Sequence, residues 1–108
     1  MSLLIERSDN MGVSFELNWY LVIENIDNLE VIDSTTFKVR KNENRIYPIG
    51  GLIPIIEKDN GCLGIVEIRG IDIRKDFTDI IFIWNKESDI SKDIKNHYYD
   101  MYLQMKKN

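Results

Sequence analysis

Apolar and polar residues alternate along most of the chain between residues 15 and 84, as they do in strands with one buried face. In the segment 15–26 the odd positions from Phe15 to Ile23 are all apolar, and both faces are apolar from Tyr20 onward. This pattern predicts a first strand that is buried on two sides. The same reasoning predicts strands at 29–32, 35–40, 45–49, 52–57, 62–69, 71–74 and 77–84.

Glycine and proline divide these strands. Asn60-Gly61 lies between two apolar runs and predicts the centre of a type I′ hairpin that pairs 52–58 with 62–69. Gly50-Gly51 predicts a tight bend with positive φ. Pro54 cannot donate a backbone hydrogen bond, so it indicates a sheet edge or a bulge, and Gly70 indicates a break between two strands.

The periodicity becomes helical after residue 88. Apolar residues follow one another at spacings of four, four, three and four, at Ile90, Ile94, Tyr98, Met101 and Met105. Ser88 or Asp89 is suited to cap the start of a helix. We therefore expect an amphipathic helix over 88–108 that lies against the sheet and buries Ile94.

Together these elements predict one mainly β (α+β) domain. Residues 15–87 would form a small antiparallel β-barrel or half-barrel, 88–108 the C-terminal amphipathic helix, and 1–14 a polar N-terminal arm, within which Met11 is a second candidate start. The composition agrees, because the 108 residues include eighteen isoleucines and no alanine, which favours sheet over a helical bundle.

Composition and charge exclude several classes of function. One histidine (His97) and one cysteine (Cys62) exclude a Cys/His zinc cluster, an intramolecular disulfide and most histidine-dependent catalytic triads. We expect no metal, no cofactor and no membrane span, and the lone cysteine without a secretory signal predicts a cytoplasmic protein. The net charge of −4 lowers the expectation of nucleic-acid binding by the whole surface, but a local basic face remains compatible with it.

The segment 35–69 resembles the PUA-like barrels (pseudouridine synthase and archaeosine transglycosylase), in particular their ASC-1-homology (ASCH) branch. The resemblance lies in a Phe37-Lys38-Val39-Arg40-Lys41 strand, a polar loop to Arg45, a Tyr47–Gly50 turn and an apolar strand from Leu52. The glycine-marked hairpin at Asn60-Gly61 and the strand Gly64–Ile68 would follow. The family's aspartate after the turn glycine is absent, because Gly51 occupies that position.

A second pattern resembles a family of small Gram-positive proteins of unknown function. It consists of Gly12, Glu16-Leu17-Asn18 and the run Arg45-x-Tyr47-Pro48-Ile49. This resemblance implies no activity.

The first candidate site is a basic face formed by Lys38, Arg40, Lys41 and Arg45. Strand alternation places Lys38 and Arg40 on the face opposite Phe37 and Val39. The PUA-like resemblance implies that this face meets RNA or a nucleotide-like ligand. Arginine would supply bidentate phosphate contacts, and Tyr47 would stack on a base. An ordinary solvated strand face is the alternative interpretation.

Three functions are therefore open. The leading hypothesis is a non-enzymatic binding module for RNA or a nucleotide. The second is an acidic, immunity- or inhibitor-like protein-interaction domain that binds a basic protein, with the C-terminal helix as its anchor or as a homo-oligomer surface. The third, implied by the ASCH branch, is a small amide hydrolase that uses Thr36, Lys38 and either Glu57 or Glu67.

Overall fold

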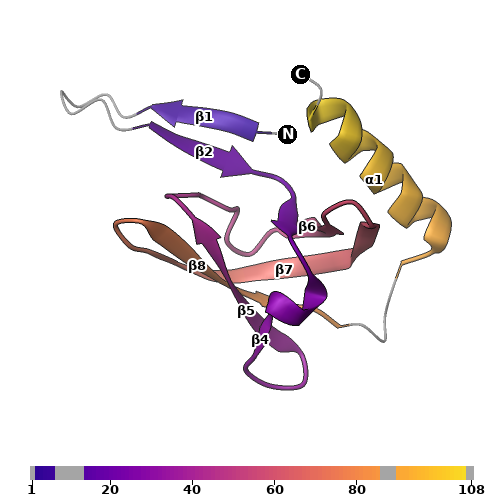
Figure 1. Ribbon diagram of the computed structural model, residues 1–108, viewed down its shortest axis with the longest axis horizontal. Coiled ribbons are helices and arrows are strands. Elements are labelled where there is room, and N and C mark those ends of the chain that lie inside the picture. The colour runs from indigo at the N-terminus through magenta and orange to yellow at the C-terminus, as the bar shows by residue number, and fades with distance from the viewer. Residues whose placement is uncertain (1, 7–13, 86–89, 107–108) are drawn as a thin grey trace.

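Six strands of the computed structural model form one mixed sheet, and a single helix, α1, lies along its side (Figure 1). The structure describes residues 2–6, 14–85 and 90–106. In chain order the elements are β1 (Ser2–Glu6), β2 (Ser14–Asn18), β3 (Leu21–Ile23), the short 3-10 helix η1 (Ile26–Asn28), β4 (Glu30–Val31), β5 (Thr36–Asn42), β6 (Leu52–Glu57), β7 (Gly61–Ile73), β8 (Phe77–Ile83) and α1 (Lys92–Lys106). The prediction of a mainly β, α+β fold with one C-terminal helix is confirmed.

The strand order in the sheet is β3-β6-β7-β8-β5-β4, and every pair is antiparallel except β3 with β6. The parallel pair departs from the antiparallel expectation. It is short because β3 pairs only with Ile55–Glu57 of β6. Pro54 lies just before this pairing, and the register shifts between Ile55 and Ile56, so the proline does indicate an irregular position.

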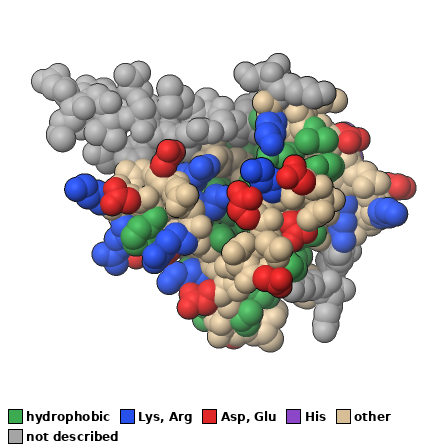
Figure 2. Space-filling model, in the orientation of Figure 1, with side chains coloured by type: hydrophobic (Ala, Val, Ile, Leu, Met, Phe, Trp, Pro, Cys, Tyr) green, Lys and Arg blue, Asp and Glu red, His purple; other side chains and the backbone are tan. Residues whose placement is uncertain are grey.

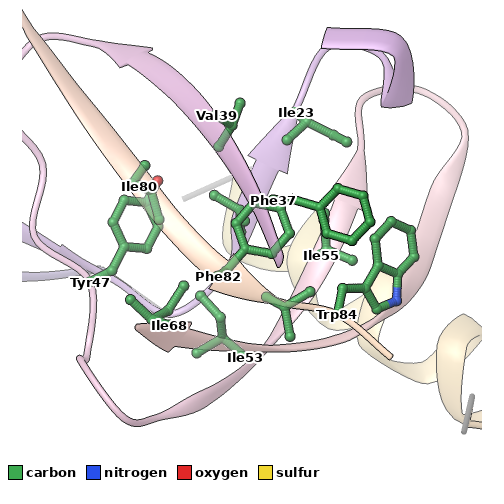
Figure 3. Packing of buried hydrophobic residues seen from close by; sticks show 12 residues of the cluster. Ile23, Phe37, Val39, Tyr47, Ile53, Ile55, Ile68, Ile80, Phe82 and Trp84 are labelled. Atoms are coloured by element: carbon green, nitrogen blue, oxygen red, sulfur yellow. The ribbon is translucent and has the colours of Figure 1, made fainter. Parts of the chain in front are cut away.

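The core lies on the inner face of the curved sheet. Phe37 and Phe82 stack with their ring centroids 5.9 Å apart, and Trp84 packs against Phe37 at 6.0 Å (Figure 3). One face of β8, continued by the residue after it, lies in this core, since Thr78, Ile80, Phe82 and Trp84 are all buried. The curvature brings β5 close to β3, where Val39 and Ile23 belong to the same buried cluster.

The β6–β7 hairpin forms as predicted, but its turn is different. Glu57 pairs with Gly61, so the turn comprises Lys58, Asp59 and Asn60 instead of Asn60-Gly61 alone. Asp59 has φ 67 and Gly61 has φ 131, whereas Asn60 does not have a positive φ. The Asn60 amide instead donates to the Glu57 carboxylate at 2.9 Å, and this bond stabilises a turn that starts two residues earlier and ends one residue earlier than predicted.

Three other strand boundaries differ from the predictions. Gly70 does not end a strand, because an irregularity between Ile68 and Gly70 lets β7 continue to Ile73. The expected strand at 45–49 is reduced to an isolated bridge between Ile46 and Leu17. The first strand divides into β2 and β3 at Trp19 and Tyr20.

The predicted polar arm contains a strand. Residues Ser2–Glu6 form β1, which pairs antiparallel with β2 from Ser2 opposite Asn18 to Glu6 opposite Ser14. The apolar run at 3–5 gives this segment the character of a strand.

The helix begins later than predicted and is more exposed. The Ser91 hydroxyl accepts a hydrogen bond from the Ile94 backbone N–H at 3.3 Å and so caps α1; the predicted caps Ser88 and Asp89 lie outside the described residues. Ile94 is 45% exposed, so the prediction that it is buried is wrong. The helix lies against β7, and none of its residues is fully buried.

Candidate functional site

The predicted basic face carries its own acidic partners. The Asp79 carboxylate, which is buried on β8, accepts hydrogen bonds from Arg40 Nε at 2.8 Å and Nη2 at 3.1 Å. Lys38 Nζ lies 3.7 Å from the same carboxylate and 3.6 Å from that of Glu30. The Arg40 guanidinium also lies over the Phe77 ring, 3.7 Å from its centroid. Lys38 and Arg40 are together as predicted, but their charges are largely compensated.

The other three predicted binding residues point elsewhere. Tyr47 is 2% exposed and belongs to the core, so it cannot stack on a base as predicted. Lys41 is on the same face of β5 as Phe37 and Val39, because alternate residues of a strand share a face. Its ammonium reaches inward and donates to the Val22 carbonyl of β3. Arg45 donates from Nε to the Asn42 carbonyl at 3.1 Å.

Basic and acidic side chains are interspersed on the face shown in Figure 2. This distribution and the Asp79 contacts give the predicted phosphate-binding surface a mixed potential. Of the predicted residues, Lys38 and Arg40 share a carboxylate partner, Asp79.

The carboxylates expected in a hydrolase are engaged by other groups. Glu57 accepts a hydrogen bond from the Ile26 backbone N–H at 2.8 Å and another from Asn60. Glu67 pairs with Arg69 at 2.7 Å. Lys38 forms its ion pairs with Glu30 and Asp79, which are not the carboxylates that the resemblance implied.

Asp79 makes the stability of the protein depend on pH in the acidic range. Hydrogen bonds from Arg40, followed by the charges of Arg40 and Lys38, lower the pKa of the Asp79 carboxyl below its ordinary value of 3.8. The folded state therefore favours the ionised form, and the resulting stabilisation is complete above pH 4 and is lost as the pH falls through the lowered pKa. We expect the stability advantage of the wild type over Asp79→Asn to shrink steadily below pH 4 in urea denaturation. Asp72→Asn, which removes an exposed carboxylate, is the control; an advantage over Asp79→Asn that is constant from pH 7 to pH 2 would contradict this prediction.

An apolar groove lies between α1 and the outer face of β6 and β7. Ile56 and Cys62 of these strands are buried but lie outside the main core cluster. The groove has a volume of about 540 Å³. Its lining is apolar or aromatic throughout, from Trp19, Tyr20, Leu52, Ile53, Pro54, Ile65, Ile90, Tyr98, Met101 and Met105.

Several side chains at the groove remain accessible. Leu52 is 71% exposed, and Trp19 and Met101 are each 41% exposed. The aromatic residues at one end are organised, since Tyr20 packs on Tyr102 with a centroid distance of 5.7 Å and Tyr99 packs on Tyr102 at 6.3 Å. Burial, followed by proximity to Tyr98 and Cys62, raises the pKa of the Tyr20 hydroxyl, which therefore stays neutral and able to donate at physiological pH.

Sequence patterns identify the helical stripe but miss the groove. Alternation predicts one continuous strand through Trp19 and Tyr20. In the structure the strand is interrupted there, between β2 and β3, and Tyr20 packs on Tyr102 of α1. Two adjacent aromatic residues inside an alternating strand are the signal available in the sequence.

Other kinds of site find little support in the described part of the chain. Across residues 17–85 and 90–106, no three His, Cys, Asp or Glu side chains are grouped so that they could hold a metal ion. Over the same residues, α1 is too short and too polar to cross a membrane, and no other helix is long enough to do so.

Comparison with known proteins identifies the fold alone. No family profile matches the sequence. No curated protein matches it either. The structure is similar to the X-ray crystal structure of the protein ytmB from Bacillus subtilis, a structural-genomics target, with a TM-score of 0.61 and 22% sequence identity over 68% of this chain and 89% of that chain. A likeness at this identity establishes a shared architecture for the sheet and leaves the activity to the site itself.

Proposed function

We propose that the protein is a non-enzymatic interaction module that binds an apolar segment of another protein in the groove between α1 and β6–β7. The single observation that carries this proposal is the continuous apolar and aromatic lining of a 540 Å³ groove. Pockets of this size and character receive bulky side chains or ligands of similar volume. Trp, Tyr and Met, which are enriched where proteins bind each other, supply half of the lining.

The exposed groove residues favour a partner over a purely structural role. Burying Leu52, Trp19 and Met101 against a partner would remove apolar surface from water, at about 25 cal/mol per Å². The hydroxyls of Tyr20 and Tyr98 offer hydrogen-bond donors for orienting the bound segment. The cytoplasm remains the proposed compartment because the sequence contains a single cysteine, Cys62, so that no disulfide can form within the chain.

This proposal corresponds to the second hypothesis from the sequence, a protein-interaction domain. It differs in the partner, which is an apolar segment of a protein and not a basic protein. RNA binding is less well supported because Asp79 and Glu30 accompany Lys38 and Arg40, and because Tyr47 is buried.

A selection from a random peptide library tests the proposal. We expect the selected peptides to share bulky apolar residues and to bind with micromolar affinity, measured by fluorescence polarisation. Leu52→Lys should weaken this binding about tenfold or more, because it places a charge where an apolar side chain would be buried.

The matched control is Ile49→Lys. Ile49 is an apolar residue of similar exposure, 66%, that is not among the groove residues, so this variant should bind as the wild type does. Equal binding by Leu52→Lys and the wild type would show that the groove is not the binding surface. Binding of a short RNA at about 50 mM salt that Arg40→Ala abolishes would restore the nucleic-acid hypothesis instead.

A further inference from the structure

A second pocket lies where the curved sheet brings β5 close to β3. Its volume is about 320 Å³, and it is lined by Ile23, Glu24, Asn28, Val39, Arg40 and Lys41. Ile23 and Val39 form its apolar wall, and Figure 3 shows these two side chains on β3 and β5. Its polar lining supplies one amide, one carboxylate and two cations.

Lys41 is the unusual residue of this pocket. Lysine is rarely found on the core-facing side of a strand, because removing an ammonium from water is costly. An ammonium has three N–H donors. Within the described residues, the Val22 carbonyl is the acceptor for one of them. The remaining donors are available to a ligand in the pocket.

The cations around this pocket outnumber the carboxylates. Arg40 has Asp79 as its partner, and Lys58 lies 3.9 Å from Glu24. Among the described residues, Lys41 and Arg45 have no carboxylate within ion-pair distance, and their hydrogen bonds go to backbone carbonyls. Four cations therefore face two carboxylates, which leaves an excess of two positive charges.

The electrostatic environment of Lys41 agrees with this count. Burial, followed by repulsion from Arg45 and then from Lys58, lowers the pKa of the Lys41 ammonium, and Glu24 only partly opposes this effect. A bound anion would relieve the repulsion and raise the pKa again.

We propose that the pocket between β3 and β5 binds a small organic phosphate, with the Lys41 ammonium as the anchoring cation. A phosphate monoester carries a charge of about −1.5 to −2 near neutral pH, which matches the excess of two positive charges. The Asn28 amide would donate to a phosphate oxygen, and the organic group would pack on Ile23 and Val39. This inference goes beyond the proposed interaction with an apolar segment and does not depend on the groove beneath α1.

Isothermal titration calorimetry with phenyl phosphate, inorganic phosphate and benzoate tests the proposal. We expect phenyl phosphate to bind most tightly, since inorganic phosphate lacks the apolar group and benzoate carries one charge instead of two. Lys41→Met should weaken the binding of phenyl phosphate about tenfold or more, because it removes a charge-assisted hydrogen bond. Lys75→Met, which removes an exposed lysine in the turn between β7 and β8, should have no effect.

Two further measurements keep the test decisive if Lys41→Met also perturbs the fold. Arg45→Gln should weaken the binding of phenyl phosphate several-fold through the loss of one of the two uncompensated charges. As the pH rises through the lowered pKa of Lys41, the affinity for phenyl phosphate should fall, because the neutral amine no longer attracts the anion. Equal affinity for Arg45→Gln and the wild type, or tighter binding of benzoate than of phenyl phosphate, would overturn the proposal. Unchanged binding in Leu52→Lys separates this site from the groove.

Discussion

Phe82→Ala is expected to lower the free energy of unfolding by about 3–5 kcal/mol, because it truncates a large side chain at the centre of the core. Phe82 has no exposed surface and stacks on Phe37. Its truncation removes apolar burial and leaves a cavity between β8 and β5. Because small domains are stable by about 5–15 kcal/mol in total, urea denaturation should show a large shift of the midpoint.

Phe77→Ala is the matched control because it makes the same chemical change on the same strand. Phe77 is half-buried and packs beneath the Arg40 guanidinium, so we expect a clearly smaller loss. Equal losses for the two variants would mean that the inner face of β8 is not the centre of the core.

Thr78→Val should destabilise the protein by about 2 kcal/mol although the two side chains have the same shape. The Thr78 hydroxyl is fully buried, donates to the Glu43 carbonyl at 2.8 Å and accepts from the Arg45 backbone N–H at 3.0 Å. Valine can do neither, so both backbone groups of the loop after β5 would lose their partner. The loss should appear in thermal and urea denaturation, and hydrogen exchange at the Arg45 amide should become faster.

Thr78→Ser distinguishes the role of the hydroxyl from that of packing. Serine keeps both hydrogen bonds and loses only a methyl group, so its destabilisation should be about half as large or less. If Thr78→Ser were as unstable as Thr78→Val, the methyl group and not the hydroxyl would account for the effect.

Local patterns predict the strands better than their ends. The alternation at Phe77–Trp84 and at Thr36–Arg40 identifies two strands and their buried faces, because one face of each strand meets the core. The extent of β7 escapes prediction because the register shifts at Arg69 and Gly70 then pairs with Ile81, which no periodicity reveals. The predicted hairpin turn lies one residue too late because Asp59, and not Asn60, adopts the positive φ.

The candidate sites depend on contacts that one sequence does not encode locally. Asp79 lies 39 residues from Arg40 along the chain, so the compensation of the basic face is invisible until the strands are paired. Alternation along β5 does predict that Lys41 points inward, because alternate residues share a face and Phe37 and Val39 point inward. In the sequence, Lys41 belongs with Lys38 and Arg40 only because all three are basic. The groove unites Trp19 and Tyr20 with a helix at the other end of the chain, and only the tertiary structure brings them together.

The short strands at the two ends of the six-stranded sheet limit how this protein can assemble. β3 offers three residues and β4 two, which is too little backbone to template the strand of a neighbouring molecule. At β3 the Val22 carbonyl already accepts a hydrogen bond from the Lys41 ammonium. An inward-pointing charge next to an edge strand also discourages edge-to-edge aggregation. Concentrated solutions should therefore resist growth of this sheet from one molecule to the next by backbone addition at these two edges.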